Sequence, residues 1–215
     1  MKAIDMKRDL RSRFGLARDQ RSRQTCLAFA MSDSHAAARG DPWAPLSCEY
    51  LFYHAKLRDK RPAHEGTTIA AIRTAMRLDG QPLEIDWPYM DVLPQDLDKW
   101  KPPTGVGTVY RRASVTRASA FTNVWDAIEA DTPAVVVMTI SNAFFLPDAD
   151  CVVDSTESVD PSLRHAVLAV AIGVRASDKF ILVRNSWGDQ WGCSGYAWLS
   201  EKYATPRILS TIIVN

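Results

Sequence analysis

The first hundred residues carry apolar positions at helical spacing. Three stretches rich in Ala, Leu, Met and aromatic residues predict helices over 25–39, 47–58 and 67–78. Gly40 directly follows the first stretch and Gly80 closely follows the third, which is where glycine commonly ends a helix. This half of the chain is therefore predicted to be mainly helical.

After Lys101–Pro103 the pattern changes to short, β-branched apolar runs bounded by Gly, Pro, Asp and Ser. These runs predict strands over 105–115, 134–140, 165–174, 180–184, 196–199 and 208–214, with one short helix over 121–130. Residues 1–18 are predicted to form an extended or irregular lead-in. Helices followed by strands are typical of an α+β protein with segregated lobes. We expect a helical lobe over about 19–100 and a β-rich lobe over about 101–215, on which the N-terminal segment is a candidate to pack.

Composition and charge narrow the function classes. The length of 215 residues fits one compact unit made of two lobes, and a content of 47% hydrophobic and 24% charged residues excludes a disordered chain. A net charge of +1 gives no support to a nucleic-acid partner. The basic, polar first residues lack the apolar core of a signal peptide, and no apolar run approaches the ~20 residues of a membrane span. The sequence therefore predicts a cytoplasmic protein with reduced thiols and no membrane or nucleic-acid partner.

Cys26 lies at the start of the first predicted helix. The unpaired N–H groups and positive dipole end of a helix favour a thiolate, which is the form of cysteine that acts as a nucleophile. The alternative is a buried, inert thiol, the common fate of a free cysteine. His165 opens an apolar strand, and Asn185 follows it further along the chain. A side-chain amide oxygen that accepts from the imidazole N–H would fix the orientation and tautomer of the ring. Trp187 would cover that hydrogen bond.

Three segments resemble the papain family of cysteine peptidases. Residues 18–30 (RDQRSRQTCLAFA) are similar to its nucleophile segment and residues 165–170 (HAVLAV) to its histidine strand. Residues 185–196 (NSWGDQWGCSGY) are the most specific match. His165 follows Cys26 within the roughly 130–150 residues typical of these enzymes. With weaker matches at 65–68 and 87–89, the resemblance covers the chain from about residue 10 to its end.

The resemblance implies a two-lobed fold, in which a cleft separates the helical lobe from an antiparallel, β-barrel-like lobe. It implies that Cys26 is the nucleophile, that His165 is the general base and then acid, and that Asn185 orients His165. Gln20 would donate to the oxyanion hole together with the backbone N–H of Cys26. The Cys26–His165 pair would rest as thiolate and imidazolium. No metal ion or cofactor is implied.

The resemblance also suggests where a substrate would lie. Glu65 and Gly66 would run beside its backbone, Arg164 would stand at the mouth of the cleft, and Trp187 would lie next to the reacting groups. The carboxylate of Glu65 at the rim favours basic side chains in the substrate.

The other cysteines do not lie at the positions of the family's bridges. Cys48, Cys151 and Cys193 are therefore expected to be free thiols. A zinc site built from Cys48, His54 and His64 lacks standard ligand spacing, so no metal site is predicted.

The leading functional prediction is a cytoplasmic cysteine endopeptidase acting on protein or peptide substrates through a thioester intermediate. A transpeptidase, deamidase or isopeptidase with the same triad remains an alternative, as does a silent papain-fold binding module. Only 25 residues precede Cys26, which leaves no room for a long propeptide. Restraint is therefore expected from a regulatory protein partner, a neighbouring or fused protein, a blocking loop or narrow specificity.

Overall fold

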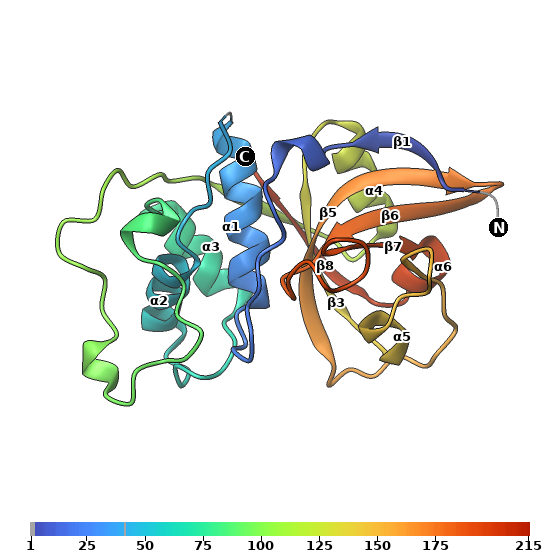
Figure 1. Cartoon of the computed structure of the whole chain (residues 1–215). Coiled ribbons are helices and arrows are strands. Elements are labelled where there is room, and N and C mark those ends of the chain that lie inside the picture. The colour runs from blue at the N-terminus through green and yellow to red at the C-terminus, as the bar shows by residue number, and fades with distance from the viewer. Residues whose placement is uncertain (1–2, 41) are drawn as a thin grey trace.

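Helix α1 (Cys26–Arg39) stands between a helical lobe and a sheet lobe in the computed structural model, which describes residues 3–40 and 42–215 (Figure 1). Every residue from Leu27 to Ala36 is buried. A helix with small or apolar side chains on most of its sides has no face suited to water. It therefore packs in the interior, between two layers. The nucleophile candidate Cys26 is thereby placed at the junction of the lobes.

Helices α2 (Cys48–Asp59) and α3 (Ile69–Leu78) complete the helical lobe. Both begin at a hydroxyl cap, where Ser47 accepts from the Tyr50 N–H and Thr68 accepts from the Ala71 N–H. The three helices predicted from the sequence are confirmed to within a few residues at each end. None of the helices in the described part of the chain is long and apolar enough to cross a bilayer.

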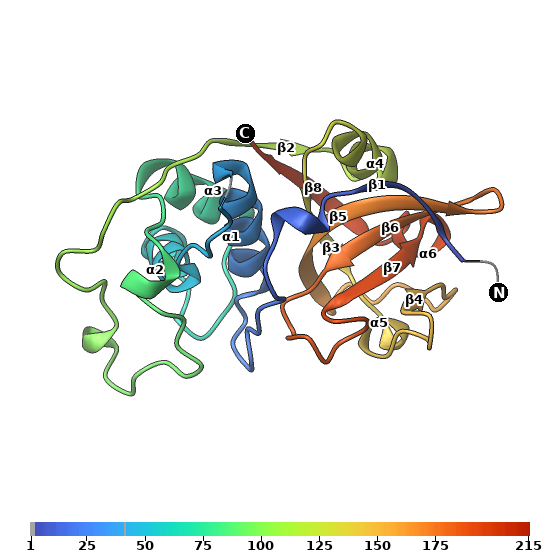
Figure 2. The same ribbon diagram turned by 45° about the horizontal axis from the view of Figure 1, so that its top comes forward.

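The second lobe is built on one eight-stranded sheet, shown from a second direction in Figure 2. Its strands are β1 (Asp5–Asp9), β2 (Ser114–Arg117), β3 (Ala134–Thr139), β4 (Val152–Val153), β5 (Arg164–Arg175), β6 (Asp178–Arg184), β7 (Tyr196–Ser200) and β8 (Ile208–Val214). Their order is β2-β8-β3-β5-β6-β7-β4, and β1 pairs with β5. All pairings are antiparallel except β4 with β7.

The α+β fold with a helical and a β-rich lobe is confirmed, but the sheet is open, so the β-rich lobe is not a closed barrel. Over residues 3–40 and 42–215 the strand path ends at β2 on one side and β4 on the other, without a pairing between them. β2 has four residues and β4 has two, so neither edge offers a long row of backbone groups for closure.

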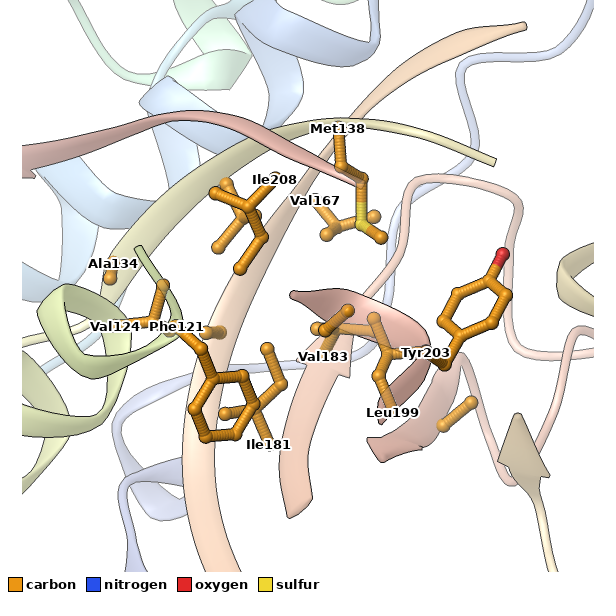
Figure 3. Packing of buried hydrophobic residues seen from close by; sticks show 14 of the residues in the cluster. Phe121, Val124, Ala134, Met138, Val167, Ile181, Val183, Leu199, Tyr203 and Ile208 are labelled. Atoms are coloured by element: carbon orange, nitrogen blue, oxygen red, sulfur yellow. The ribbon is translucent and has the colours of Figure 1, made fainter. Parts of the chain in front are cut away.

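Both faces of the sheet are buried, each against a different core. On β3, Val136 and Met138 join the core under helix α4 (Phe121–Glu129), part of which is drawn in Figure 3, whereas Val135 joins the core of α1, α2 and α3. Successive side chains of a strand point to opposite faces, so one strand serves two cores. This explains why β3 and β5 appear as continuous apolar runs, and it fixes the two lobes against each other.

Some predicted elements differ from the structure. The predicted strand over 105–115 is wrong, because only Ser114–Arg117 forms a strand there and Tyr110 instead makes an isolated bridge with Gln81. The sequence also missed β1, β4 and the short helices α5 (Asn142–Phe145) and α6 (Glu201–Ala204). All five residues of β1 are exposed, so its pairing with β5 uses backbone groups that leave no alternating apolar pattern.

A disulfide joins Cys151 and Cys193, whose Cα atoms lie 5.7 Å apart. The expectation that both are free thiols is therefore wrong, while Cys48 is a free, buried thiol as expected. The pairing depends on β4 lying beside β7, which brings residue 151 next to the turn before β7. Because β4 has two residues, its sequence carries no signal of that neighbour.

Candidate active site

A cleft of about 850 Å³ lies between the two lobes. Seven of the predicted site residues line it: Gln20, Cys26, Glu65, Gly66, Arg164, His165 and Trp187. The eighth, Asn185, lies behind His165 and is buried. The structure thus brings together every side chain proposed for the site from segments far apart in the sequence.

Cys26 is the first residue of α1, and the turn before it is held in place by Tyr89. The Tyr89 hydroxyl donates to the Gln20 carbonyl and accepts from the Thr25 hydroxyl, each at 2.8 Å. Thr25 does not cap the helix with its side chain, so the first N–H groups of α1 remain available. Burial raises the pKa of the Cys26 thiol, while N–H groups of Ala166, Leu27 and Cys26 itself act to lower it.

His165 donates from Nε2 to the side-chain oxygen Oδ1 of Asn185 at 2.7 Å. That bond fixes the tautomer and leaves Nδ1 as the ring atom for proton exchange with the thiol. The Trp187 ring lies 4.7 Å from the His165 ring and the Phe144 ring lies 5.7 Å from it, between centroids. Burial lowers the pKa of His165 to about 4. The hydrogen bond to Asn185 acts to raise that pKa, but burial has the larger effect. Trp187 thus lies against the His165 ring, and its role as a cover of the hydrogen bond stays a prediction.

The charge state of the pair depends on opposing effects. Burial disfavours both a thiolate at Cys26 and an imidazolium at His165. The helix N-terminus and the mutual attraction of the two charges favour the ion pair. The resting thiolate–imidazolium pair therefore stays a prediction, which the pH dependence of Cys26 alkylation would test.

Gln20 is held rigidly in the wall of the cleft. Its Nε2 donates to the Arg23 carbonyl at 2.7 Å, and its Oε1 accepts from the Ser186 hydroxyl at 2.7 Å. The Gln20 backbone N–H donates to the Ser186 carbonyl at 2.8 Å. A primary amide has two N–H donors, so one remains for an oxygen in the cleft. Ser186 also donates its backbone N–H to Asn185, and so it links two of the predicted site residues.

A buried ionic cluster, which sequence reasoning missed, supports the site from behind. Asp33 of α1 accepts from Arg18 at 2.6 Å and from Arg184 at 2.7 Å. Arg184 immediately precedes Asn185 and also donates to the carbonyls of Gly15 and Leu16. The cluster ties α1, β6 and the segment before Gln20 together. The available sequence signal was an arginine directly after the apolar run 180–183 in the strand Asp178–Arg184.

The predicted substrate-binding residues line the cleft, but Gly66 is already hydrogen-bonded. Its N–H donates to the Gln24 side chain at 3.2 Å, and its carbonyl accepts from Lys56 at 3.1 Å. Glu65 and Arg164 are exposed. Across residues 3–40 and 42–215, no group of three Cys, His, Asp or Glu side chains is arranged to hold a metal ion.

Comparison with known proteins matches residues 2–213 to the papain family cysteine proteases. Cysteine proteinase 3 of Entamoeba histolytica is 28% identical over 206 residues, which cover 94% of this chain and 64% of that protein. The chain thus spans just under two thirds of that relative.

Two solved structures share the fold. One is xylellain, a cysteine protease from Xylella fastidiosa, with a TM-score of 0.77, 20% identity and coverage of 99% of this chain and 87% of that one. The other is the Carica candamarcensis cysteine protease CMS1MS2 in complex with E-64, with a TM-score of 0.77, 18% identity and 96% of each chain covered. With the family match across nearly its whole length, this chain belongs to the papain family of cysteine proteases.

Proposed function

We propose that the chain is a cysteine endopeptidase that cleaves protein or peptide substrates in the cleft between its lobes. The observation that carries the proposal is the convergence of four groups in one place. Cys26 lies at a helix N-terminus, His165 is oriented by Asn185 at 2.7 Å, and Gln20 is fixed beside them. This is the set that acyl transfer by a thiol requires.

The first half-reaction forms a thioester. The Cys26 sulfur attacks the scissile carbonyl carbon, and its proton resides on Nδ1 of His165. The carbonyl oxygen becomes an anion, which the Cys26 backbone N–H and the second N–H of Gln20 Nε2 stabilise, at about 3–4 kcal/mol for each donor. The carbon–nitrogen bond then breaks, and His165 gives its proton to the departing amine.

The second half-reaction releases the acyl group. Water attacks the thioester carbon while His165 takes its proton, and the carbon–sulfur bond breaks to regenerate Cys26. The side-chain oxygen of Asn185 holds the imidazole in one tautomer through both half-reactions. Trp187 and Phe144 keep bulk water from that hydrogen bond, which stays strong in their apolar surroundings.

We propose residues 1–215 as one catalytic unit, with support from the strands β3 and β5 that contribute to both cores. The cytoplasmic location stays a prediction. The reduced thiols expected with it are contradicted for one pair of cysteines, because the Cys151–Cys193 disulfide is typical of an oxidising compartment. A regulatory protein partner likewise stays a prediction.

Covalent labelling tests the proposal. We expect an epoxysuccinyl affinity label to modify Cys26 under mild conditions, with the adduct located by mass spectrometry and absent from Cys26→Ala. The free thiol of Cys48 is an internal control, because its burial predicts no labelling. If the protein is intact and folded but Cys26 is not labelled, the proposal that it is an enzyme is wrong. Product analysis with and without an added amine then separates hydrolysis from acyl transfer to an amine.

A further inference from the structure

Two arginines line the cleft from opposite lobes. Arg61 belongs to the loop between α2 and α3, and Arg164 opens β5 directly before His165. Both side chains are exposed, and both border the same cavity as Cys26. A peptide in this cleft therefore lies in the field of two arginine side chains.

Neither guanidinium is neutralised by a carboxylate from the described part of the chain. The Arg164 Nε donates to the Pro161 carbonyl at 3.0 Å, which leaves its terminal nitrogens free for another acceptor. Within the ranges 3–40 and 42–215, neither Arg61 nor Arg164 forms an ion pair. Both positive charges are therefore available to a ligand.

The carboxylates closest in sequence to the two arginines already have hydrogen-bond donors. Asp59 accepts from Lys56, from the Thr67 hydroxyl and from the backbone N–H of Arg61. Asp160 accepts from the hydroxyl and the backbone N–H of Ser162. Among the described lining residues, Glu65 supplies the one carboxylate, against two guanidinium groups. The cleft thus has a positive balance of fixed charge.

Part of the cleft lining is apolar. Its apolar residues include Ile69, Val137, Ile140, Leu163 and Ala166. Walls of low dielectric strengthen the field of charges at a cleft, so an anionic group of a bound peptide is attracted more strongly here than on a flat surface. The planar guanidinium also matches the two oxygens of a carboxylate.

We propose that Arg61 and Arg164 select peptides that carry aspartate or glutamate near the scissile bond. The inference rests on the proposed function and deepens it. It runs against the preference for basic side chains expected from Glu65, because two cations outweigh one exposed carboxylate. Arg164, adjacent to His165, acts on a side chain close to the scissile bond, and Arg61 acts on one bound along the helical wall.

Matched fluorogenic peptides test this inference. The two peptides of a pair have the same sequence except at one position, which is Glu in one peptide and Gln in the other. The pairs differ in where this position lies: at one of the three residues before the scissile bond or one of the two residues after it. We expect kcat/KM to favour Glu about two- to fivefold at a position that faces one arginine. The ratio should fall towards one near 1 M salt, where the screening length is about 3 Å. Arg61→Gln and Arg164→Gln should each abolish the preference at a different position.

Arg117→Gln is the matched control, since Arg117 is exposed on β2 and outside the cleft, and it should keep the wild-type ratios. Equal cleavage of Glu and Gln peptides at every position would overturn the inference and leave the proposed function standing. If neither peptide is cleaved, the proposed function fails. Binding of the same pairs to Cys26→Ala, measured by fluorescence anisotropy, then decides the inference separately, and equal Kd values would overturn it.

Discussion

Asp33→Asn removes the negative charge at the centre of the buried ionic cluster. The Asp33 carboxylate faces Arg18 and Arg184, and the side chains of these three residues are 6%, 14% and 1% exposed, respectively. Asparagine keeps the shape of the side chain but leaves the Arg184 guanidinium without its counter-charge. Arg18 keeps only the Glu84 carboxylate as a counter-charge, at 3.4 Å. We expect the variant to fold less stably and to loosen the segment that carries Gln20.

The magnitude follows from the burial of the cluster. Removing one partner of a buried ion pair costs about 3–5 kcal/mol of unfolding free energy. For a protein of this length, 1 kcal/mol corresponds to roughly 2–4 °C in Tm, so the expected fall is about 6–20 °C. The assay is urea and thermal unfolding followed by circular dichroism near pH 7. Asp5→Asn is the control, because its ion pair with Lys7 is exposed and contributes at most about 1 kcal/mol.

The pH dependence gives an independent check. Burial acts to raise the pKa of Asp33, but Arg18 and Arg184 outweigh it and hold that pKa below its ordinary value. The stabilisation is therefore complete above the unfolded pKa of about 3.9 and is lost as the pH falls through the folded pKa. Wild type and Asp33→Asn should converge in strong acid. A loss below about 1 kcal/mol near pH 7, or a difference that persists unchanged in acid, would refute the reasoning.

Three further outcomes are expected at and beside the cleft. Asn185→Ala should lower kcat/KM by about 10²-fold and move the acid–base profile, because the lost hydrogen bond lowers the pKa of His165 further; an unshifted profile would contradict this. Gln20→Ala should reduce kcat about 10²-fold with little change in KM, as loss of one oxyanion donor does. A change confined to KM would contradict this and would assign Gln20 to binding of the substrate in its ground state. Replacing Cys151 and Cys193 together by Ala should cost about 2–4 kcal/mol in urea unfolding, and wild type in reductant should behave like the variant.

The predicted helices and most of the predicted strands are present because each depends on nearby residues. The caps at Ser47 and Thr68 and the apolar stretch of α1 act within a few residues of chain. Prediction failed where the partner is distant. The β1 strand depends on β5, and the Cys151–Cys193 bridge depends on the parallel pairing of β4 with β7.

The candidate site divides in the same way. The sequence determined Cys26 at a helix N-terminus and identified His165, Asn185 and Gln20 through the segments that carry them. Tertiary structure decided what surrounds these groups: the Ser186 hydroxyl that holds Gln20, and the Asp33–Arg184 pair behind Asn185.

The packing of one lobe on the other also decided that Arg61 and Arg164 line the same cleft. Hydrogen bonds, ion pairs and fields act through space. Sequence patterns report the periodicity of one element, and they contain no record of which other element lies against it.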